Sequence, residues 1–230
     1  MSSVLNGMTI TTADAAAADL QRILYPHCQR CMIAGSVRRR AQVVGDIEFV
    51  VIPKFEAPRD ALPGTNAAPV DWLDEFLKIV DAGDHRDLKR PVKAKGAGRR
   101  PPWGPKYKKL LYQHVNRWIS IDLWITSPER FGATLAIRTG DADFSRLLVT
   151  QRHEGGAMPL GLRQMEGGIR RFAGEPSQAL RAWEMPDLWE PVDTPDEDAF
   201  FGLLGLPTLN PPLRTMANIR KLLSRSEAVV

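Results

Sequence analysis

The segment "DIEFVVIP", residues 46–53, is the feature that most constrains how this chain can fold. Its β-branched and aromatic residues predict a buried strand, which Pro53 ends because proline cannot continue a hydrogen-bonded ladder. Two acids, Asp46 and Glu48, stand inside this hydrophobic strand. Residues i and i+2 of a strand point to the same face, so the two carboxylates project together and the apolar residues between them face the other way.

A second predicted strand, "WISIDLWI" at residues 118–125, carries one more acid. By the same rule, Asp122 shares a face with Ser120 and Trp124. If the two strands are neighbours in one sheet, three carboxylates converge, and their mutual repulsion calls for a cation. Hard oxygen ligands on rigid strands suit Mg²⁺ or Mn²⁺. The alternative is that these polar positions are simply the solvent face of a half-buried sheet.

The residues just before the first acidic strand favour the metal interpretation. Gly35-Ser36 predicts the start of a short helix, whose unpaired N–H groups attract phosphate. Three arginines, Arg38–Arg40, follow at once and add cations within reach of the same anion. A phosphate site ahead of a carboxylate pair is most simply explained by a bound metal–triphosphate complex.

The remaining pattern alternates predicted helices and strands. Helices are predicted at 11–25, 70–80, 128–137, 141–153, 194–204 and 214–225. Strands are predicted at 31–35 and 46–53, in a hairpin of 107–115 and 117–125 with Asn116-Arg117 at its turn, and in a small hairpin within 155–176. The expected N-caps are Thr11 or Thr12, Asp141 and Thr194.

Composition narrows the class of protein. The 230 residues are 43% hydrophobic and 25% charged, which is ordinary for a globular protein. No apolar run approaches the length of a membrane helix, and the N-terminus lacks a signal-peptide layout, so we expect a soluble, cytoplasmic protein. Cys28 and Cys31 form a lone Cys-x-x-Cys. We interpret them as reduced structural cysteines rather than half a zinc site or a redox pair.

Positive charge gathers between Arg86 and Lys109, where ten basic residues accompany one acid, Asp87. Such a block indicates a polyanionic partner, although its Gly and Pro content also fits a solvated loop. Trp103 favours nucleic acid, because an aromatic ring among cations can stack on a base. The candidate DNA contacts are Arg99, Arg100, Lys106 and Lys108.

Taken together, "GSVRRRAQVVGDIEFVV" resembles the Gly-Ser…Arg-Arg…Gly-Asp-x-Asp motif of the nucleotidyltransferase superfamily, in the form found in family X DNA polymerases of the polymerase beta type. The residues at the motif spacing are Gly35, Ser36, Arg39, Gly45 and Asp46. "ISIDLWI" is similar to the family strand that carries the third metal-binding Asp. "RFGATLAIRTGDADFSRLL" is similar to the segment around the family's Thr-Gly turn, often a cis peptide, and "DEDAFFGLLGLPTLNPPLRT" resembles the C-terminal stretch.

The resemblance implies an α+β fold built on a small mixed sheet. Residues 1–127 would form a nucleotidyltransferase palm with a basic loop insertion at about 86–109, and residues 128–230 an α-rich thumb. Only about 30 residues precede the motif, so we expect no N-terminal lyase domain. The implied chemistry is nucleotidyl transfer with two Mg²⁺ ions, or Mn²⁺. Asp46 and Glu48 would bridge both ions and Asp122 would bind the catalytic one. The implied nucleotide-binding residues are Gly35, Ser36, Arg39, Gly45, Arg138, Thr139 and Gly140.

Some residues depart from the family pattern. Glu48 replaces the second Asp, and Ile137-Arg138 precede the Thr-Gly turn where the polymerases usually have aromatic residues. The positions facing a nascent base pair, Ala142 and Ser145, are small. From the resemblance as a whole, we expect a minimal, monomeric DNA polymerase that acts on gapped or primer–template DNA with a dNTP substrate in repair. The alternatives are a template-independent nucleotidyltransferase and a catalytically idle nucleic-acid-binding protein of the same fold.

Overall fold

The chain divides into two compact units. The computed structural model describes residues 7–58, 68–92, 101–179 and 184–227. The first unit comprises Met1–Val37 and Ala41–Thr126, and the second comprises Arg38–Arg40 and Ser127–Val230. The three arginines therefore belong to the second unit, although they lie in the sequence between elements of the first. The assignment of these units as palm and thumb stays a prediction.

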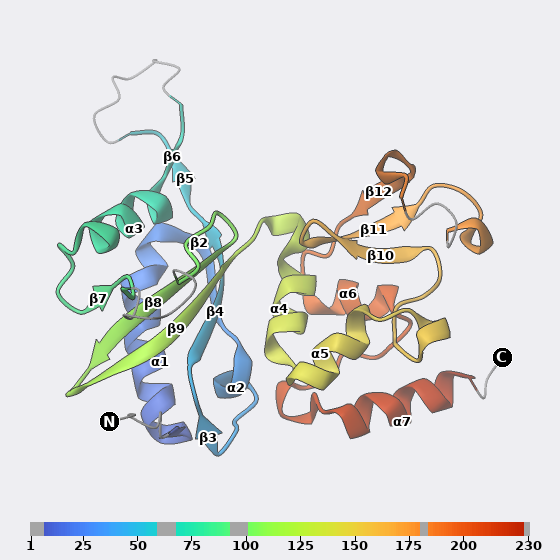
Figure 1. The fold of residues 1–230 in the computed structure, drawn as a ribbon, viewed down its shortest axis with the longest axis horizontal. Coiled ribbons are helices and arrows are strands. Elements are labelled where there is room, and N and C mark those ends of the chain that lie inside the picture. Colours follow the sequence, from blue (N-terminus) through green and yellow to red (C-terminus); the bar gives the residue numbers. More distant parts are fainter. Residues whose placement is uncertain (1–6, 59–67, 93–100, 180–183, 228–230) are drawn as a thin grey trace. The chain divides into compact units, whose positions relative to one another are not determined.

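A five-stranded mixed sheet is the framework of the first unit, in the order β2-β4-β9-β8-β7 (Figure 1). Its strands are β2 (Cys28–Ile33), β4 (Ile47–Pro53), β7 (Leu88–Lys89), β8 (Tyr107–His114) and β9 (Arg117–Ile125). β4 and β9 are parallel, and the other neighbours are antiparallel. The α+β class with a mixed sheet is thus confirmed, as are the acidic strand and the hairpin. β7 lies inside the segment predicted as a basic loop, so part of that loop is a strand.

Two helices, α1 (Ile10–Leu24) and α3 (Trp72–Ala82), pack on one face of this sheet. The buried face of α1 is rich in alanine, which lets the helix approach the strands closely, and α3 contributes Leu73, Phe76, Leu77 and Val80. Cys28 and Cys31 lie in the same cluster as free, buried thiols, so their side chains pack in the core of the first unit. Hydrogen bonding to Cys28, together with burial, raises the pKa of the Cys31 thiol.

Two sequence predictions are wrong, the N-cap of α1 and the turn between β8 and β9. The N-cap of α1 is Thr9, whose hydroxyl accepts a hydrogen bond from the Thr12 amide at 3.4 Å, so the predicted caps at Thr11 and Thr12 are wrong. The hairpin turn is Val115-Asn116 rather than Asn116-Arg117, because His114 pairs with Arg117. Val115 has a φ of 54°, a conformation that β-branched residues rarely adopt, and the sequence therefore argued against a turn there.

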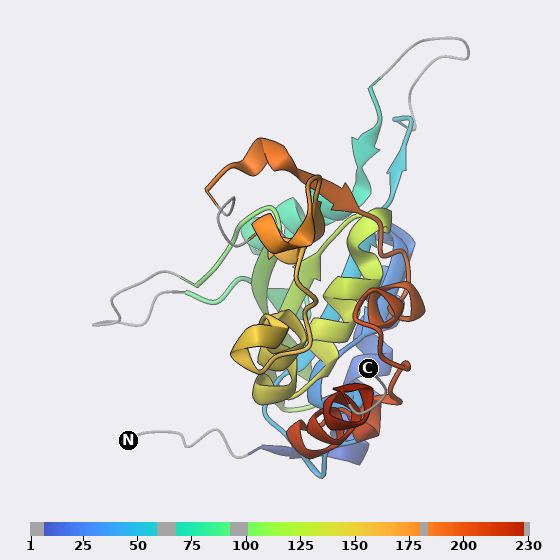
Figure 2. The ribbon, with the colours of Figure 1, turned by 90° about the vertical axis from the view of Figure 1, so that its right-hand side faces the viewer.

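Short elements complete the first unit. They are β1 (Met8–Thr9), β3 (Val43–Val44), the four-residue helix α2 that begins at Gly35, β5 (Phe55–Glu56) and β6 (Val70–Asp71). β5 and β6 pair as a short antiparallel ribbon that extends from the end of β4 (Figure 2). The 3₁₀ turns among the described residues of both units are Tyr25–His27, Pro128–Arg130, Arg152–Glu154, Pro176–Gln178, Pro186–Leu188 and Pro211–Leu213.

The second unit packs helices against a three-stranded antiparallel sheet. Its helices are α4 (Phe131–Thr139), α5 (Ala142–Val149), α6 (Glu197–Leu203) and α7 (Met216–Glu227), and its strands are β10 (Leu162–Met165), β11 (Gly168–Phe172) and β12 (Trp189–Val192). Residues from all four helices form one hydrophobic cluster with β10 and β11. The predicted hairpin within 155–176 is confirmed as β10 and β11.

Capping residues fix where the helices of the second unit begin. Asp141 caps α5 as predicted, accepting a hydrogen bond from the Phe144 amide at 2.7 Å. The cap of α6 is Asp196, not Thr194, because the helix starts two residues later than the sequence suggested. Thr194 is buried, and its amide donates to the Glu129 carbonyl at 2.6 Å. In the part of the chain that is described, no helix combines the length and apolar character needed to cross a bilayer.

Candidate active site

The acids of β4 and β9 lie in one register on one face of the sheet. Glu48 pairs directly with Asp122, and Asp122 pairs on its other side with Lys109 of β8. Directly paired residues share a face, so an acid, an acid and a base form a row across three strands. We call this surface the carboxylate face, defined by Asp46, Glu48 and Asp122. The residues on either side of Glu48 and Asp122 in the sequence point into the hydrophobic core.

Asp46 lies immediately before β4 and is half-buried. Burial raises its pKa, and the negative charge of Asp122 raises it further, while Lys109 acts in the opposite direction. The two acids therefore lie close enough for the charge of Asp122 to act on the pKa of Asp46. This is the proximity that the period-two pattern of the two strands predicted for Asp46 and Asp122.

Asp122 is held by two side chains of the neighbouring strand. The Lys109 ammonium donates to Asp122 Oδ1 at 2.9 Å, and the Asp122 side chain is only 14% exposed. Tyr107, two residues before Lys109 and on the same face, also hydrogen-bonds to Asp122. Its pKa is raised by burial, by this hydrogen bond and by the charges of all three acids. A single phenol thus lies within electrostatic range of the whole carboxylate face.

Glu48 has different surroundings. The indole N–H of Trp124 donates to Glu48 Oε1 at 3.3 Å, and the Trp124 ring stacks on Tyr107 with 4.1 Å between centroids. Gly35 lies against the Glu48 carboxylate from the other side, with a φ of 60°, and a Cβ added there would overlap the carboxylate. Gly35 is therefore required twice, for its backbone conformation and for the room that it leaves to Glu48.

These contacts bear on whether the face can hold a metal. Among the described residues, no three His, Cys, Asp or Glu side chains are arranged to hold an ion. The chemistry of the donors nevertheless fits Mg²⁺ or Mn²⁺, because all three are carboxylates. A further hard oxygen lies on the same face: the buried Ser120 hydroxyl, for which the described residues offer no hydrogen-bond partner. The donors fit the ion, while Lys109 and Trp124 engage two of them.

The predicted phosphate-binding turn is small. α2 has only four residues, Gly35–Arg38, and so short a helix supplies little macrodipole. Ser36 is half-exposed, and its carbonyl accepts a hydrogen bond from the Ala41 amide at 3.0 Å. Gly45 is exposed, and a Cβ added there would contact nothing, so packing does not require glycine at that position.

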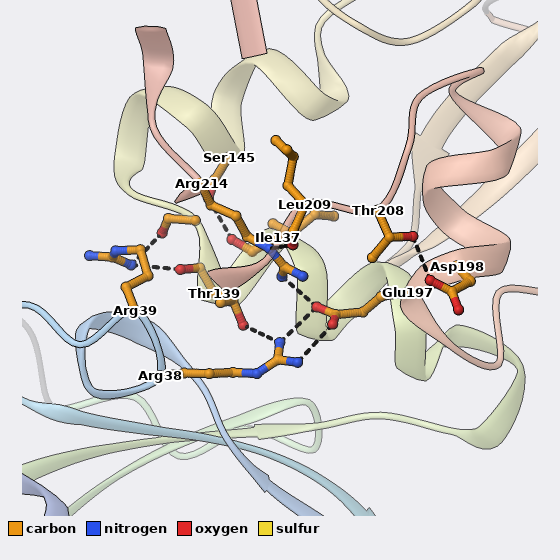
Figure 3. Close-up of polar contacts among 11 residues, drawn as sticks. Arg38, Arg39, Ile137, Thr139, Ser145, Glu197, Asp198, Thr208, Leu209 and Arg214 are labelled. Atoms are coloured by element: carbon orange, nitrogen blue, oxygen red, sulfur yellow. Dashed lines mark hydrogen bonds and ion pairs between the residues drawn. The ribbon is translucent and has the colours of Figure 1, made fainter. Parts of the chain in front are cut away.

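In the second unit, Arg39 joins the predicted Thr-Gly turn (Figure 3). One guanidinium nitrogen, Nη1, donates to the Thr139 carbonyl at 2.7 Å and to the Gly140 carbonyl at 2.8 Å. Arg39 thereby connects two other predicted nucleotide-binding residues, and Arg138 lies half-buried beside them in the sequence. The described residues contain no cis peptide bond, so the cis peptide implied for Thr139-Gly140 is wrong.

Sequence reasoning missed the ion-pair network beside this turn. Glu197 of α6 accepts two hydrogen bonds from Arg38, both at 2.7 Å, and another from Arg214 (Figure 3). Arg38 also donates to the Thr139 hydroxyl at 2.9 Å. Burial alone would raise the pKa of Glu197, but the hydrogen bonds and charges of the two arginines outweigh it and lower that pKa. Arg214, only 1% exposed, stands at the start of the helix predicted at 214–225, and nothing in its sequence context marks it as buried.

The predicted DNA contacts are unevenly placed. Lys106 is exposed, whereas Lys108 is buried, with its ammonium 3.9 Å from Asp74 and 5.0 Å from the centre of the Trp103 ring. Arg99 and Arg100 lie outside the described residues. Trp103 packs against the core of the first unit, and the Arg90 guanidinium is 4.9 Å from its ring centre, so the ring already has partners. Lys108 and Trp103 therefore make contacts within the first unit, and we do not propose them as nucleic-acid contacts.

Comparison with known proteins supports the fold alone. No protein-family model matches the sequence, and no curated protein matches it either. Solved structures do match. The ternary P/T complex of Leishmania infantum polymerase beta matches with a TM-score of 0.60 and 18% sequence identity, and the match covers 91% of this chain and 77% of the polymerase chain. The ternary gap complex of the same polymerase gives a TM-score of 0.62 and 16% identity, covering 90% and 70%. The chain has a polymerase beta-like fold, as the resemblance of its motifs implied.

Proposed function

We propose that this chain is a metal-dependent nucleotidyltransferase that transfers a nucleotide from a dNTP to a primer 3′-hydroxyl, filling short gaps in DNA repair. One observation carries the proposal above the others. β4 and β9 pair in parallel so that Glu48 lies beside Asp122, with Asp46 two residues upstream of Glu48. The polymerase beta-like fold supports DNA as the partner and supports the division into palm and thumb.

The carboxylates would hold the metal ions. Asp46, Glu48 and Asp122 would together hold the divalent ions, Mg²⁺ or Mn²⁺. When bound, such ions lower the pKa of an attacking hydroxyl and neutralise charge on the transferring phosphate. The all-oxygen donor set supports this assignment, as does the Ser120 hydroxyl on the same face, which has no hydrogen-bond partner among the described residues.

The remaining residues would bind and orient the nucleotide. In the transfer, the primer 3′-hydroxyl gives up its proton, for which Asp122 is the candidate acceptor. The bond between its oxygen and the α-phosphorus forms, and the bond from that phosphorus to the leaving pyrophosphate breaks. Ser36 and Arg39 would hold the pyrophosphate charge. The carbonyls of Thr139 and Gly140 occupy Nη1 of Arg39, and a guanidinium has further N–H donors available for phosphate oxygens. The backbone of the Thr139-Gly140 turn, with Arg138 beside it, would contact the sugar.

The test is nucleotide incorporation on a DNA substrate with a single-nucleotide gap. Each dNTP and rNTP is supplied in turn with Mg²⁺ or Mn²⁺, and Asp46→Ala is compared with Asp84→Ala, the same change at an exposed acid of the first unit. We expect incorporation that follows the template, is lost in Asp46→Ala and is retained in Asp84→Ala. Activity that survives Asp46→Ala would refute the assignment of the site. The comparison of sugars tests what Ile137-Arg138 do in place of aromatic residues.

A second candidate function is nucleic-acid binding without catalysis. It is favoured by the contacts of Lys109 with Asp122 and of Trp124 with Glu48, which already engage two of the three acids. The same assay separates the candidates. DNA binding without incorporation under any metal supports the idle protein, and addition that ignores the template supports a template-independent transferase.

A further inference from the structure

Lys109 has no role in the function proposed so far, yet its position is fixed by the fold. Its strand, β8, pairs with β9 so that Lys109 lies directly opposite Asp122. The neighbouring Lys108 points to the other face and lies against Asp74, as the alternation of a strand requires. Lys109 is therefore the member of this lysine pair that the strand register directs onto the carboxylate face.

The contacts of Lys109 are those of a counter-ion. Its ammonium is 2.9 Å from Asp122 Oδ1, in a site where the lysine side chain is 33% exposed and the aspartate 14%. A hydrogen bond between two charged groups is roughly twice as strong as a neutral one, and partial burial reduces its screening by solvent. Asp122 thus keeps a cation of its own while no metal is bound.

A divalent ion would need the same carboxylate oxygens. An ammonium in contact with Asp122 repels a metal ion at the same carboxylate, so Lys109 has to move away from Asp122 for the metal to bind without that repulsion. Trp124 does not compete in this way, because its indole N–H is uncharged and engages Glu48 instead.

We propose that Lys109 is a counter-ion built into the carboxylate face, which holds Asp122 in the metal-free protein and which a divalent cation must displace in order to bind. This inference rests on the proposed metal site, and it assigns to Lys109 a regulatory position at that site. In the absence of substrate, Lys109 makes the affinity of the site for a divalent cation weaker than it would be with the three carboxylates and no lysine.

The experiment is a titration of the full-length protein with Mn²⁺ alone, in which free Mn²⁺ is measured by electron paramagnetic resonance. Lys109→Met keeps the length of the side chain and removes its charge. The matched control is Lys78→Met, which removes an exposed lysine that pairs with Asp74 and Glu75 on α3. We expect Lys109→Met to bind Mn²⁺ about tenfold more tightly, since a net hydrogen bond to a charged group is worth about that factor, and Lys78→Met to match the wild type.

Two further variants keep the outcomes distinct. Lys109→Arg retains the charge and should keep wild-type affinity, and Asp46→Ala should weaken Mn²⁺ binding in every background. Unchanged or weaker Mn²⁺ binding by Lys109→Met, with binding still dependent on Asp46, overturns the role of Lys109 and leaves the metal site standing. Binding that ignores Asp46, or no binding by any variant, overturns the metal site and the inference with it.

Thermal unfolding supplies a second readout that does not depend on activity. In the presence of a chelator, Lys109→Met should melt at a lower temperature than the wild type, because the acids of the carboxylate face lose their counter-ion. Adding Mn²⁺ should raise its melting temperature by more than that of the wild type. Equal shifts in the two proteins would contradict the proposal. If Lys109→Met does not fold, Lys109→Gln, which retains a polar group, replaces it in both measurements.

Discussion

Replacing Glu197 with Gln should destabilise the second unit more than any other single amide substitution of an acid on α6. Glu197 is the only acid among the described residues that accepts hydrogen bonds from both Arg38 and Arg214. Its side chain is 12% exposed, and those of Arg38 and Arg214 are 19% and 1% exposed. Glu197→Gln keeps the shape and one acceptor oxygen but leaves two guanidinium charges without their counter-ion.

The magnitude follows from that burial. Breaking a buried ion pair from one side costs about 3–5 kcal/mol, and the acceptor retained by glutamine, with the partial exposure of Arg38, points to the lower end. We expect a loss of about 3 kcal/mol in the free energy of unfolding of the second unit, equivalent to roughly a hundredfold loss of hydrogen-exchange protection. The matched control is Asp198→Asn on the same helix, an exposed acid that contacts Thr208, where we expect less than about 1 kcal/mol.

Hydrogen exchange of the α6 amides is the appropriate assay, because a chain of two units need not unfold in a single step. The lowered pKa of Glu197 also predicts the direction in which this stabilisation changes with pH. Since that pKa is lowered from its ordinary value of 4.5, the stabilisation is fully present above pH 4.5 and is lost as pH falls through the folded-state pKa. The difference between wild type and Glu197→Gln should therefore shrink on acidification. Equal protection of the two proteins at pH 7 would refute the reasoning.

Three other substitutions test the close contacts of the fold and site. Gly35→Ala should lower the free energy of unfolding by about 1–2 kcal/mol through its φ of 60° alone, which chemical unfolding measures. The new Cβ should also displace the Glu48 carboxylate and so lower nucleotide incorporation, which the gap-filling assay measures. Gly132→Ala should cost about 1–3 kcal/mol, because its Cβ would overlap the Asp196 backbone, and a drop in melting temperature checks it. Trp124→Phe keeps a ring in the stack but removes the N–H donor to Glu48, so we expect a loss of about 1 kcal/mol in stability and a changed Mn²⁺ affinity.

The acids of the carboxylate face could be predicted because strands have a fixed period. Asp46 and Glu48 stand two apart in an apolar strand, and Asp122 stands in a second one, so each strand specified which face its acids would take. The pairing of those strands could not be derived from the period alone. It depends on β4 and β9 meeting in parallel, although more than sixty residues separate them in the sequence.

Lys109 was missed for a physical reason that can be traced to a single turn. In a hairpin, the position of the turn decides which residues lie opposite each other. With the turn at Val115-Asn116, Lys109 faces Asp122, whereas a turn displaced by one residue pairs different side chains. Asparagine is the usual residue at a positive φ and valine is not, so the sequence indicated the wrong turn. Lys109 also ends the basic block of residues 86–109, so its charge was attributed to a polyanionic partner rather than to the acids of the sheet.

The charges on the carboxylate face connect the metal chemistry with the substrate. When Asp46, Glu48 and Asp122 are ionised, Lys109 leaves a net charge of minus two, which one divalent cation balances. If that cation displaces Lys109, the ammonium needs another anion near the end of β8. A nucleotide or a nucleic-acid backbone supplies phosphate oxygens of that kind, and a triphosphate also supplies the negative charge that a second divalent ion requires. Because the carboxylate face already holds the Lys109 ammonium, it should bind a divalent cation more readily together with a phosphate group than alone.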